Sequence, residues 1–332
     1  MAEQGVLDVL AADETLAAWL RGLPDDPDLP QDVALPDGAD LADVLLELAV
    51  PHGDIAELLA LRRRFADDPG AWLLLRRCVG AVVRGMGEEA VPPRFLPQLP
   101  AELGAFGRCF YAYVLVAALP YTRAYHRGIG VPDEVARSTF ADVGRNLALH
   151  RRRYGSVGVL VPSWLVLHLR GLLYQLGRLQ FQHAVLGART GAVVAAAGVA
   201  AEGDPCLNLH IPDYLGPLSP EACDQSLARA REFFARHYPQ RRYPVAVCHS
   251  WLLDPQLRDQ LPPESNIIRF QGRFRTARRE TEPDDQGPVA FVFGDPELPV
   301  AELPRRTRLE RAVGDHLRAG GHWYGGHGWF PL

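Results

Sequence analysis

Apolar residues recur every three or four positions through the first half of the chain, with polar residues between them. This spacing is typical of amphipathic helices, and breaks rich in Pro, Gly and Asp separate the segments that show it. It predicts helices over residues 40–48, 54–65, 71–84, 102–119 and 133–154. The pattern indicates no chemistry of its own, so we expect residues 1–154 to form a helical N-terminal domain.

From Gly155 onward the pattern changes to short strands joined by helices. The run that begins at Val245 is continuously apolar, as in a strand inside a sheet, whereas residues 268–274 alternate as in a half-buried strand. Strands are predicted over residues 176–186, 192–199, 207–211, 245–253, 268–274 and 289–293, and helices over 164–173, 219–238 and 307–319. We therefore expect residues 155–332 to form a mixed β-sheet domain flanked by helices, which makes the chain α+β.

One junction in this second half has the features of an anion site. The strand at residues 207–211 runs into a turn, and Ser219-Pro220-Glu221 then opens a helix with a side-chain cap and a proline at its first position. Backbone N–H groups at such a helix N-terminus suit a diphosphate. We expect the strands at His210 and Cys248 to lie side by side and to diverge toward Gly216.

Composition limits the kind of partner. With 48% hydrophobic and 23% charged residues, the 332-residue chain has the composition of a folded protein and the length of two domains. A net charge of -5 gives no reason to expect nucleic acid or an anionic membrane as the main partner. Uncharged runs such as residues 109–120 and 190–201 are shorter than the roughly 20 residues of a membrane helix. All 35 basic residues are Arg, which excludes a catalytic lysine.

The cysteine and histidine spacings predict neither a disulfide framework nor a metal centre. Five cysteines are scattered without a Cys-x-x-Cys pair, which favours a reducing cytoplasm. Residues 1–4 lack the basic start of a secretory signal. His322 and His327 lie five residues apart without an acidic companion, and Trp323 and Trp329 beside them suit a core, so we expect no metal.

Three segments carry a resemblance to a known family. They are HIPDYLGPLSPEACDQSLARAREFFARHYP, VCHSWLLDPQLRDQLPPESNIIRFQGRF and TRLERAVGDHLRAGGHW. They resemble an actinobacterial group of acyltransferase-domain proteins with a helical N-terminal domain and a GNAT-like C-terminal domain, and the resemblance covers nearly the whole chain. It implies a GNAT fold, acyl transfer and acyl-CoA as co-substrate.

The same resemblance places the cofactor loop. GNAT enzymes generally bind the diphosphate with Gln/Arg-x-x-Gly-x-Gly/Ala, and only Gly216 of that pattern is present here. The implied cofactor-binding residues are Tyr214, Leu215, Gly216, Leu218 and Ser219. Asp213 and Glu221 add negative charge and Pro217 removes an N–H, so these departures favour weakened or altered binding. Arg273, Arg275, Arg278 and Arg279 either meet a CoA phosphate or protect an exposed strand edge.

Acyl transfer from a thioester to an amine needs a base, donors for the oxyanion and an acid for the leaving thiolate. His210 and His249 are the candidate bases, because both stand on predicted strands beside the turn. For each, an ordinary hydrogen-bonded strand histidine is the alternative. Tyr324 is the candidate acid.

Cys248 raises a covalent alternative, in which the acyl group passes through an enzyme thioester. Successive strand residues point to opposite faces, so His249 is badly placed to serve Cys248, and His210 can serve it only in one strand register. A buried, inert cysteine is the simpler interpretation.

Three hypotheses follow. The first is a GNAT-type N-acyltransferase that moves an acyl group from acyl-CoA to an amine of a small molecule. The second is a catalytically altered GNAT-like protein that binds a ligand or partner, motivated by Asp213, Pro217 and Glu221. The third is a cysteine-dependent transferase or hydrolase built on Cys248.

Overall fold

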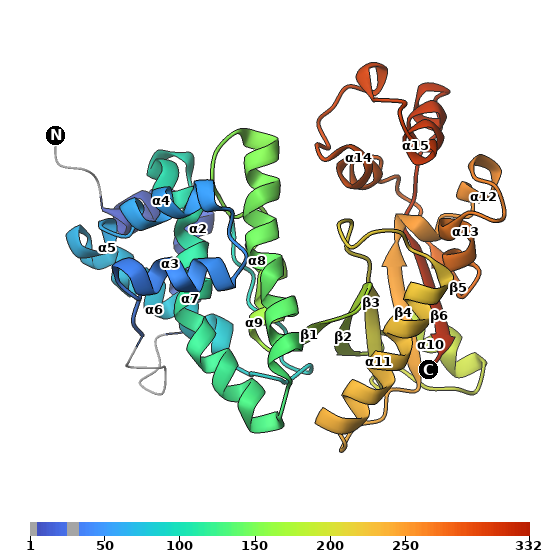
Figure 1. The fold of residues 1–332 in the computed structure, drawn as a ribbon, viewed down its shortest axis with the longest axis horizontal. Helices are drawn as coiled ribbons and strands as arrows, with labels where there is room; N and C mark the ends of the chain where they lie inside the picture. The colour runs from blue at the N-terminus through green and yellow to red at the C-terminus, as the bar shows by residue number, and fades with distance from the viewer. Residues whose placement is uncertain (1–4, 25–32) are drawn as a thin grey trace. The chain divides into compact units, whose positions relative to one another are not determined.

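The computed structural model describes residues 5–24 and 33–332, and the chain divides into two compact units, Met1–Tyr174 and Gln175–Leu332 (Figure 1). Residues 1–4, on which the expectation about a secretory signal rests, lie outside the described part. The first unit is helical apart from the start of one strand, and the second contains a mixed sheet with helices. The α+β prediction is therefore confirmed.

The first unit contains every helix that the periodicity predicts in this half. Its helices are α1 (Val6–Ala11), α2 (Glu14–Arg21), α3 (Gly38–Glu47), α4 (His52–Leu61), α5 (Arg64–Asp67), α6 (Pro69–Val83), α7 (Gly104–Ile129), α8 (Asp133–Tyr154) and α9 (Pro162–Leu169), with the 3-10 turn η1 (Ala101–Leu103) before α7. Good caps explain several starts, since the Asp68 side chain accepts from the N–H groups of Gly70 and Ala71 at the start of α6.

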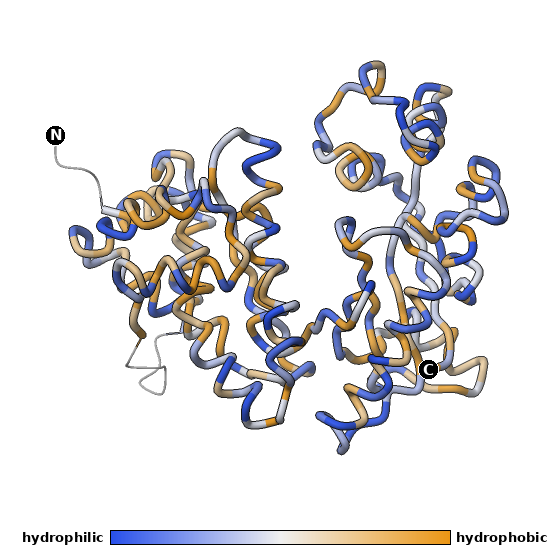
Figure 2. The backbone as a smooth tube through the Cα atoms, viewed as in Figure 1, coloured by the Kyte–Doolittle hydropathy of each residue, from blue (hydrophilic) through white to orange (hydrophobic). Residues whose placement is uncertain are grey.

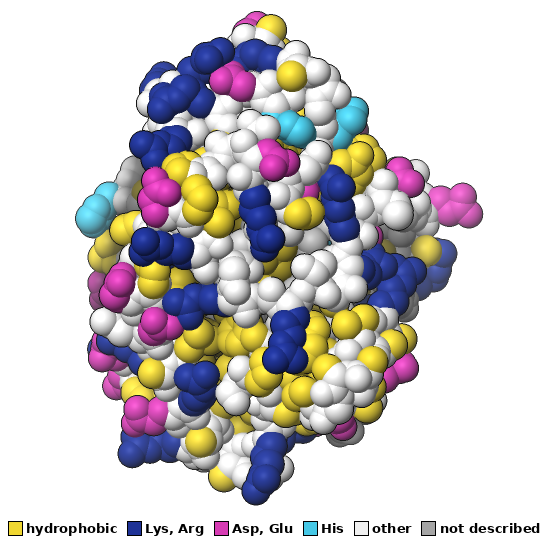
Figure 3. Space-filling view, turned by 90° about the vertical axis from the view of Figure 1, so that its right-hand side faces the viewer, with side chains coloured by type: hydrophobic (Ala, Val, Ile, Leu, Met, Phe, Trp, Pro, Cys, Tyr) yellow, Lys and Arg dark blue, Asp and Glu magenta, His cyan; other side chains and the backbone are white. Residues whose placement is uncertain are grey.

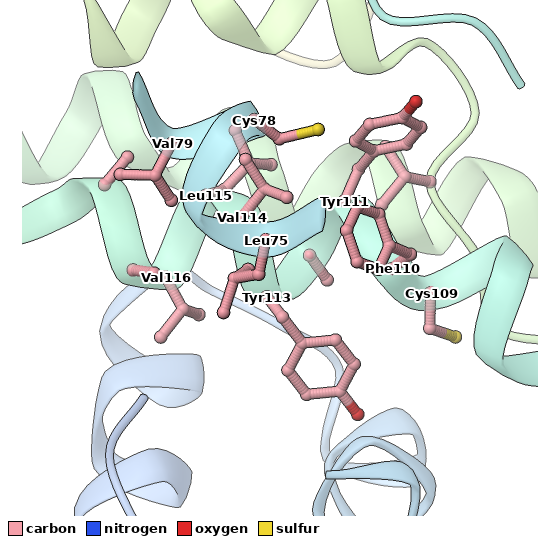
Figure 4. Packing of buried hydrophobic residues seen from close by; sticks show 14 of the residues in the cluster. Leu75, Cys78, Val79, Cys109, Phe110, Tyr111, Tyr113, Val114, Leu115 and Val116 are labelled. Carbon is pink, nitrogen blue, oxygen red and sulfur yellow. The ribbon is translucent and has the colours of Figure 1, made fainter. Parts of the chain in front are cut away.

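The core of the first unit forms around α7, whose middle is buried on every side. Figure 4 shows side chains of α6 and α7 packed together, among them Cys78 and Leu115. The centroid of the Phe65 ring lies 5.2 Å from that of Phe106 and 5.1 Å from that of Tyr113, and both ring pairs are edge to face. The segment Ala101–Ile129 has the length and apolar composition of a membrane span, but most of it is buried inside this unit, which accounts for that composition.

The boundary between the units lies after Tyr174, later than the change of pattern at Gly155 suggests. Val157, Val159 and Leu165 are fully buried in the same core as α7. Tertiary burial thus assigns residues 155–174 to the helical unit, although their pattern differs from that of the preceding helices.

The second unit is built on one six-stranded sheet with the order β1-β2-β3-β4-β6-β5. Its strands are β1 (Leu173–Leu176), β2 (Leu179–Val185), β3 (Pro205–His210), β4 (Val245–Ser250), β5 (Arg275–Arg279) and β6 (Gly326–Pro331). β3 and β4 run parallel, whereas β2 with β3, β4 with β6 and β5 with β6 run antiparallel. β5 is an edge strand, so its three arginines line an edge of the sheet. A place at an exposed strand edge is one of the two alternatives that the sequence offers for them.

Two helices cover opposite faces of this sheet. On one face, α10 (Ala188–Ala196) brings Val194 into a cluster with Val245 and Trp329. On the other, α11 (Pro220–His237) sets the Phe234 ring 6.1 Å from that of His183. Because side chains alternate along a strand, the register fixes which residues of β3 and β4 share a face.

Three predicted strands are wrong. Residues 192–199 fall largely in α10, the first four residues of 268–274 belong to α13 (Asn266–Gln271), and residues 289–293 belong to α14 (Gln286–Phe293). Short apolar runs do not separate a strand from a buried helix by periodicity alone. Ser265 starts α13 by accepting from the Ile268 N–H, a cap that the alternation concealed. The strand predicted at residues 176–186 is largely confirmed as β2, but β1 and a turn at Gly177, where φ is 85°, precede it as the first half of a hairpin.

The last part of the chain packs a second small core. It includes η2 (Trp251–Leu253), α12 (Leu257–Gln260), η3 (Val300–Glu302) and α15 (Arg308–Arg318), and it buries Trp323. Thr307 and Glu310 form the predicted capping box. Hydrophilic and hydrophobic residues alternate along α15, in keeping with one buried face (Figure 2).

Candidate functional site

The two central strands of the sheet separate at one end. β3 and β4 pair only at Leu207 with Ala246 and at Asn208 with Val247. Beyond these residues β3 stays paired with β2 as far as His210, and β4 stays paired with β6 as far as Ser250. The described strands therefore diverge toward His210, as the sequence predicts, because their ladder stops before that residue.

The turn after β3 lies at the same end of the sheet and leads into α11. The Ser219 hydroxyl accepts from the Ala222 N–H at 3.2 Å, and Pro220 is the first helical residue. Gly216 has a φ of 76°, a left-handed conformation that favours glycine. Tyr214 and Leu215 are 40% and 37% exposed, whereas Leu218 is buried at 7%. The turn thus presents its middle to solvent, and Leu218 anchors it.

Charges of both signs surround this turn. Asp213 and Glu221 are exposed, and Glu221 lies in the first turn of α11. Arg178 Nε donates to the Gly216 carbonyl at 3.0 Å, and Arg273 reaches the Pro220 carbonyl at 3.1 Å. Arg178 stands in the turn of the β1–β2 hairpin. In the sequence, its place next to Gly177 is the only signal that could have indicated a turn there. On the face drawn in Figure 3, arginine side chains stand singly or in small groups among acidic and apolar ones.

His210 ends β3 and is half-buried. Its Nε2 lies 2.9 Å from Gln182 Oε1 on β2, and the Asn208 amide donates to the same oxygen at 3.5 Å. An oxygen that accepts from both groups places the ring proton on Nε2, so a neutral His210 carries its basic lone pair on Nδ1. The sequence did not indicate Gln182, because strand pairing brings it to this place.

His249 is on the same face of the sheet as His210 but has other neighbours. It is exposed and stacks on His327 of β6 with ring centroids 4.1 Å apart, as the two residues are direct cross-strand partners. Burial of part of the ring lowers the pKa of His249, and the neighbouring His327 lowers it further. The Nε2 of His327 is 2.6 Å from Glu280, and Arg278 also contacts this carboxylate. Hydrogen bonds from His327 and Arg278 lower the pKa of Glu280 to about 2.

His249, Glu280 and His327 are also the residues that can hold a metal by type. Their ligand atoms all lie within 4.8 Å of one another, and two histidines with a carboxylate are a zinc-like set. The two rings lie at 14° to each other, so their nitrogen lone pairs lie in nearly parallel planes and do not converge. His322, the other histidine considered for a metal, bonds Asp285 at 2.7 Å instead. This arrangement is more typical of an ion-pair network than of a metal centre.

The position and the pKa of Cys248 argue against the covalent hypothesis. It shares its face with Ala246 and Leu207, whereas His210 and His249 are on the opposite face. Burial raises the pKa of its thiol to about 12. The thiol therefore stays protonated near neutral pH, whereas a nucleophile needs the thiolate. Neither candidate base is on the side of the sheet that Cys248 faces.

Tyr324 lies just before β6. A Cβ on the next residue, Gly325, would stand 2.7 Å from His249 Nε2, so the chain passes against that ring. The Tyr324 N–H donates to Asp254 at 2.9 Å, and the guanidinium of Arg279 lies 4.0 Å from the centre of its ring. The structure thus places the backbone at Gly325 against His249, whereas the Tyr324 ring lies under the guanidinium of Arg279.

Family models match both halves of the chain. A family model described as an N-acyltransferase N-terminal domain matches residues 39–171, and one described as a GNAT-like C-terminal domain matches residues 173–330. The two matches meet close to the boundary between the compact units. A search of curated proteins found no match.

Solved acyltransferase structures match almost the whole chain. An acyltransferase mutant in complex with octanoyl-CoA is 41% identical, with a TM-score of 0.89 over 98% of each chain. An acyltransferase in complex with decanoyl-CoA and teicoplanin is 40% identical, with a TM-score of 0.88 over 99% of this chain and 100% of that one. Another, in complex with CoA and 10C-teicoplanin, is 40% identical with a TM-score of 0.89 over the same shares.

Proposed function

This chain belongs to the family of acyltransferases that join an N-acyltransferase N-terminal domain to a GNAT-like C-terminal domain, and on that premise we propose that it transfers an acyl group from acyl-CoA to an amine of a small molecule. The observation that carries the proposal is the divergence of β3 from β4 beside the turn that opens α11. Such an opening suits the extended arm of a CoA thioester, and the helix N-terminus suits its diphosphate.

The relatives narrow the choice of substrates. Three of them hold octanoyl-CoA or decanoyl-CoA, and two hold teicoplanin or 10C-teicoplanin. We propose medium-length acyl chains as donors and an amine of a teicoplanin-type compound as acceptor for this chain. Coverage of nearly the full length at about 40% identity supports extending both classes to it.

His210 is the proposed base. It is held by Gln182 at the diverging end of β3, whereas His249 is exposed and bound into a network with His327 and Glu280. His210 Nδ1 takes a proton from the acceptor ammonium, and the neutral nitrogen attacks the thioester carbonyl to form the C–N bond. Unpaired backbone N–H groups in the opening stabilise the oxyanion.

Collapse of the tetrahedral intermediate breaks the C–S bond and releases CoA. The leaving thiolate takes a proton from protonated His210 or from Tyr324, and the amide nitrogen loses its second proton to solvent. The pKa of Cys248 and its place on the opposite face favour this direct transfer over an enzyme thioester.

The first prediction concerns His210. We expect His210→Ala to lower kcat with octanoyl-CoA and a teicoplanin-type amine by about 100-fold or more, the typical share of a general base. Release of the CoA thiol measures the rate, and mass spectrometry of the acceptor confirms amide formation. Cys248→Ala is the matched control and should keep kcat within about threefold, because its thiol takes no part.

Two outcomes would count against the proposal. If Cys248→Ala were inactive while folded, transfer would proceed through an enzyme thioester. If no amine were acylated although CoA bound, the chain would be a ligand-binding relative of these enzymes, as the acidic residues Asp213 and Glu221 also allow.

A further inference from the structure

Arg178 is held between α11 and the turn that precedes it. Its backbone N–H donates to Ser226 Oγ at 2.7 Å, and its Nε donates to the Gly216 carbonyl at 3.0 Å. A Cβ on Gly177 would lie 2.8 Å from Ser226 Oγ, so the hairpin approaches α11 as closely as glycine permits. The guanidinium is therefore fixed against the turn and is only 9% exposed as a residue.

This buried cation lacks a counter-ion. Among the described residues no carboxylate forms an ion pair with Arg178, and its Nη1 is buried without a hydrogen-bond partner. Burial lowers the pKa of the guanidinium, and only Cys223 and Tyr214 oppose that effect. Burying a charge is costly unless an opposite charge or full hydrogen bonding compensates it. An unpaired arginine at this place indicates that an anion completes the site.

The surroundings indicate where that anion binds. The carbonyl that Arg178 holds belongs to the exposed middle of the turn, and the positive end of the α11 dipole lies at the end of the same turn. Arg273 is nearby but already bonds Asp224 at 2.6 Å. Asp213 and Glu221 add negative charge on either side, so an anion here needs a cation that they do not neutralise.

We propose that Arg178 is a co-substrate-binding residue whose guanidinium neutralises the diphosphate of acyl-CoA at the turn around Gly216. This inference rests on the proposed function, because it assigns a residue to the same co-substrate. It also accounts for a turn that retains negative charge at Asp213 and Glu221, since the compensating cation comes from another part of the sheet.

The test compares ligands with and without the diphosphate. Calorimetry with Arg178→Gln should give a CoA Kd at least about tenfold weaker than that of the parent, while octanoyl-pantetheine, which lacks the diphosphate, should bind equally to both. Arg178→Lys keeps the charge and should recover part of the affinity. Arg242→Gln removes an exposed charge just before β4 begins, at the far end of the sheet, and should change neither Kd.

Salt provides a second measurement that needs no variant. If a charge contact with the diphosphate dominates, CoA binding to the parent should weaken with rising salt while octanoyl-pantetheine binding should not. Equal CoA affinity in the parent and Arg178→Gln would overturn the role of Arg178 and leave the proposed function standing. Equal weakening of both ligands would assign Arg178 a structural role only. A parent that binds no CoA would contradict the proposed function itself.

Discussion

At the scale of single residues, environment decides which of several similar side chains can react. His210 and His249 are on the same face of the sheet, but His210 bonds the Gln182 amide while His249 shares a network with Glu280 and His327. Residue type and approximate position were enough to predict both histidines from the sequence. Gln182 and Glu280 were not predicted as partners of these histidines, and Arg178 was not predicted at the turn, because strand pairing and helix packing bring them in from distant positions.

His126 in the first unit shows environment acting on stability. The ring is 3% exposed and stacks on Phe140 with ring centroids 5.4 Å apart, and among the described residues neither of its nitrogens has a hydrogen-bond partner. Burial lowers its pKa from 6.5 to about 4. As the pH falls through 6.5 the unfolded chain takes up a proton that the native ring refuses, so the free energy of unfolding falls until about pH 4 is reached.

We therefore expect His126→Phe to remove about 2 kcal/mol of the stability loss that the parent shows between pH 7 and pH 4.5. Denaturant unfolding at the two pH values measures it. His52→Gln, at an exposed position in α4, is the control and should leave the pH dependence unchanged. If the unfolding free energy of His126→Phe fell between pH 7 and pH 4.5 by as much as that of the parent, the native state would accept a proton on His126.

At the scale of elements, local signals predicted the parts around the site and failed elsewhere. β3, α11 and β4 were predicted because a cap, a proline and clear periodicity mark their bounds. α10 and α14 were taken for strands because each contains a short apolar run whose packing decides its form, and α13 because its residues alternate between apolar and polar. The hairpin at Gly177 was missed, and Arg178 with it.

The turn before α11 supports a prediction of its own. Parent protein at about a hundred times the CoA Kd should gain roughly 2.7 kcal/mol of unfolding free energy. Leu215→Asp adds a negative charge at an exposed position, and tenfold weaker binding would cut that gain to about 1.4 kcal/mol at the same concentration. Thermal unfolding with and without CoA measures the gain.

Val185→Asp is the matched control for this variant. Val185 is exposed on β2 and pairs with Pro205, at the end of β3 away from the turn. The same charge there should leave the full gain. Equal gains in both variants would show that the diphosphate does not bind at this turn. Leu218 is unsuited to such a test because its side chain is buried.

At the scale of the whole molecule, the two units differ in composition, in burial and in the candidate catalytic residues that they carry. The helical unit buries its periodic apolar faces around α7, and the residues considered for catalysis all belong to the second unit. The boundary could not be read from the sequence, because residues 155–174 change pattern but pack into the helical core. The lack of lysine leaves the chain without a side-chain amine that its own proposed donor could acylate.

The short ladder between β3 and β4 has a consequence for amide hydrogen exchange. Beyond Asn208 and Val247, backbone N–H groups that point into the opening lack the mutual pairing that would slow their exchange with deuterium. Peptides that cover residues 209–211 and 248–250 should label faster than those of β2, which lies between β1 and β3, and octanoyl-CoA should slow them. If the ligand changed only distant peptides, it would bind elsewhere. The separated strands thus make occupancy of the site visible before any acceptor is identified.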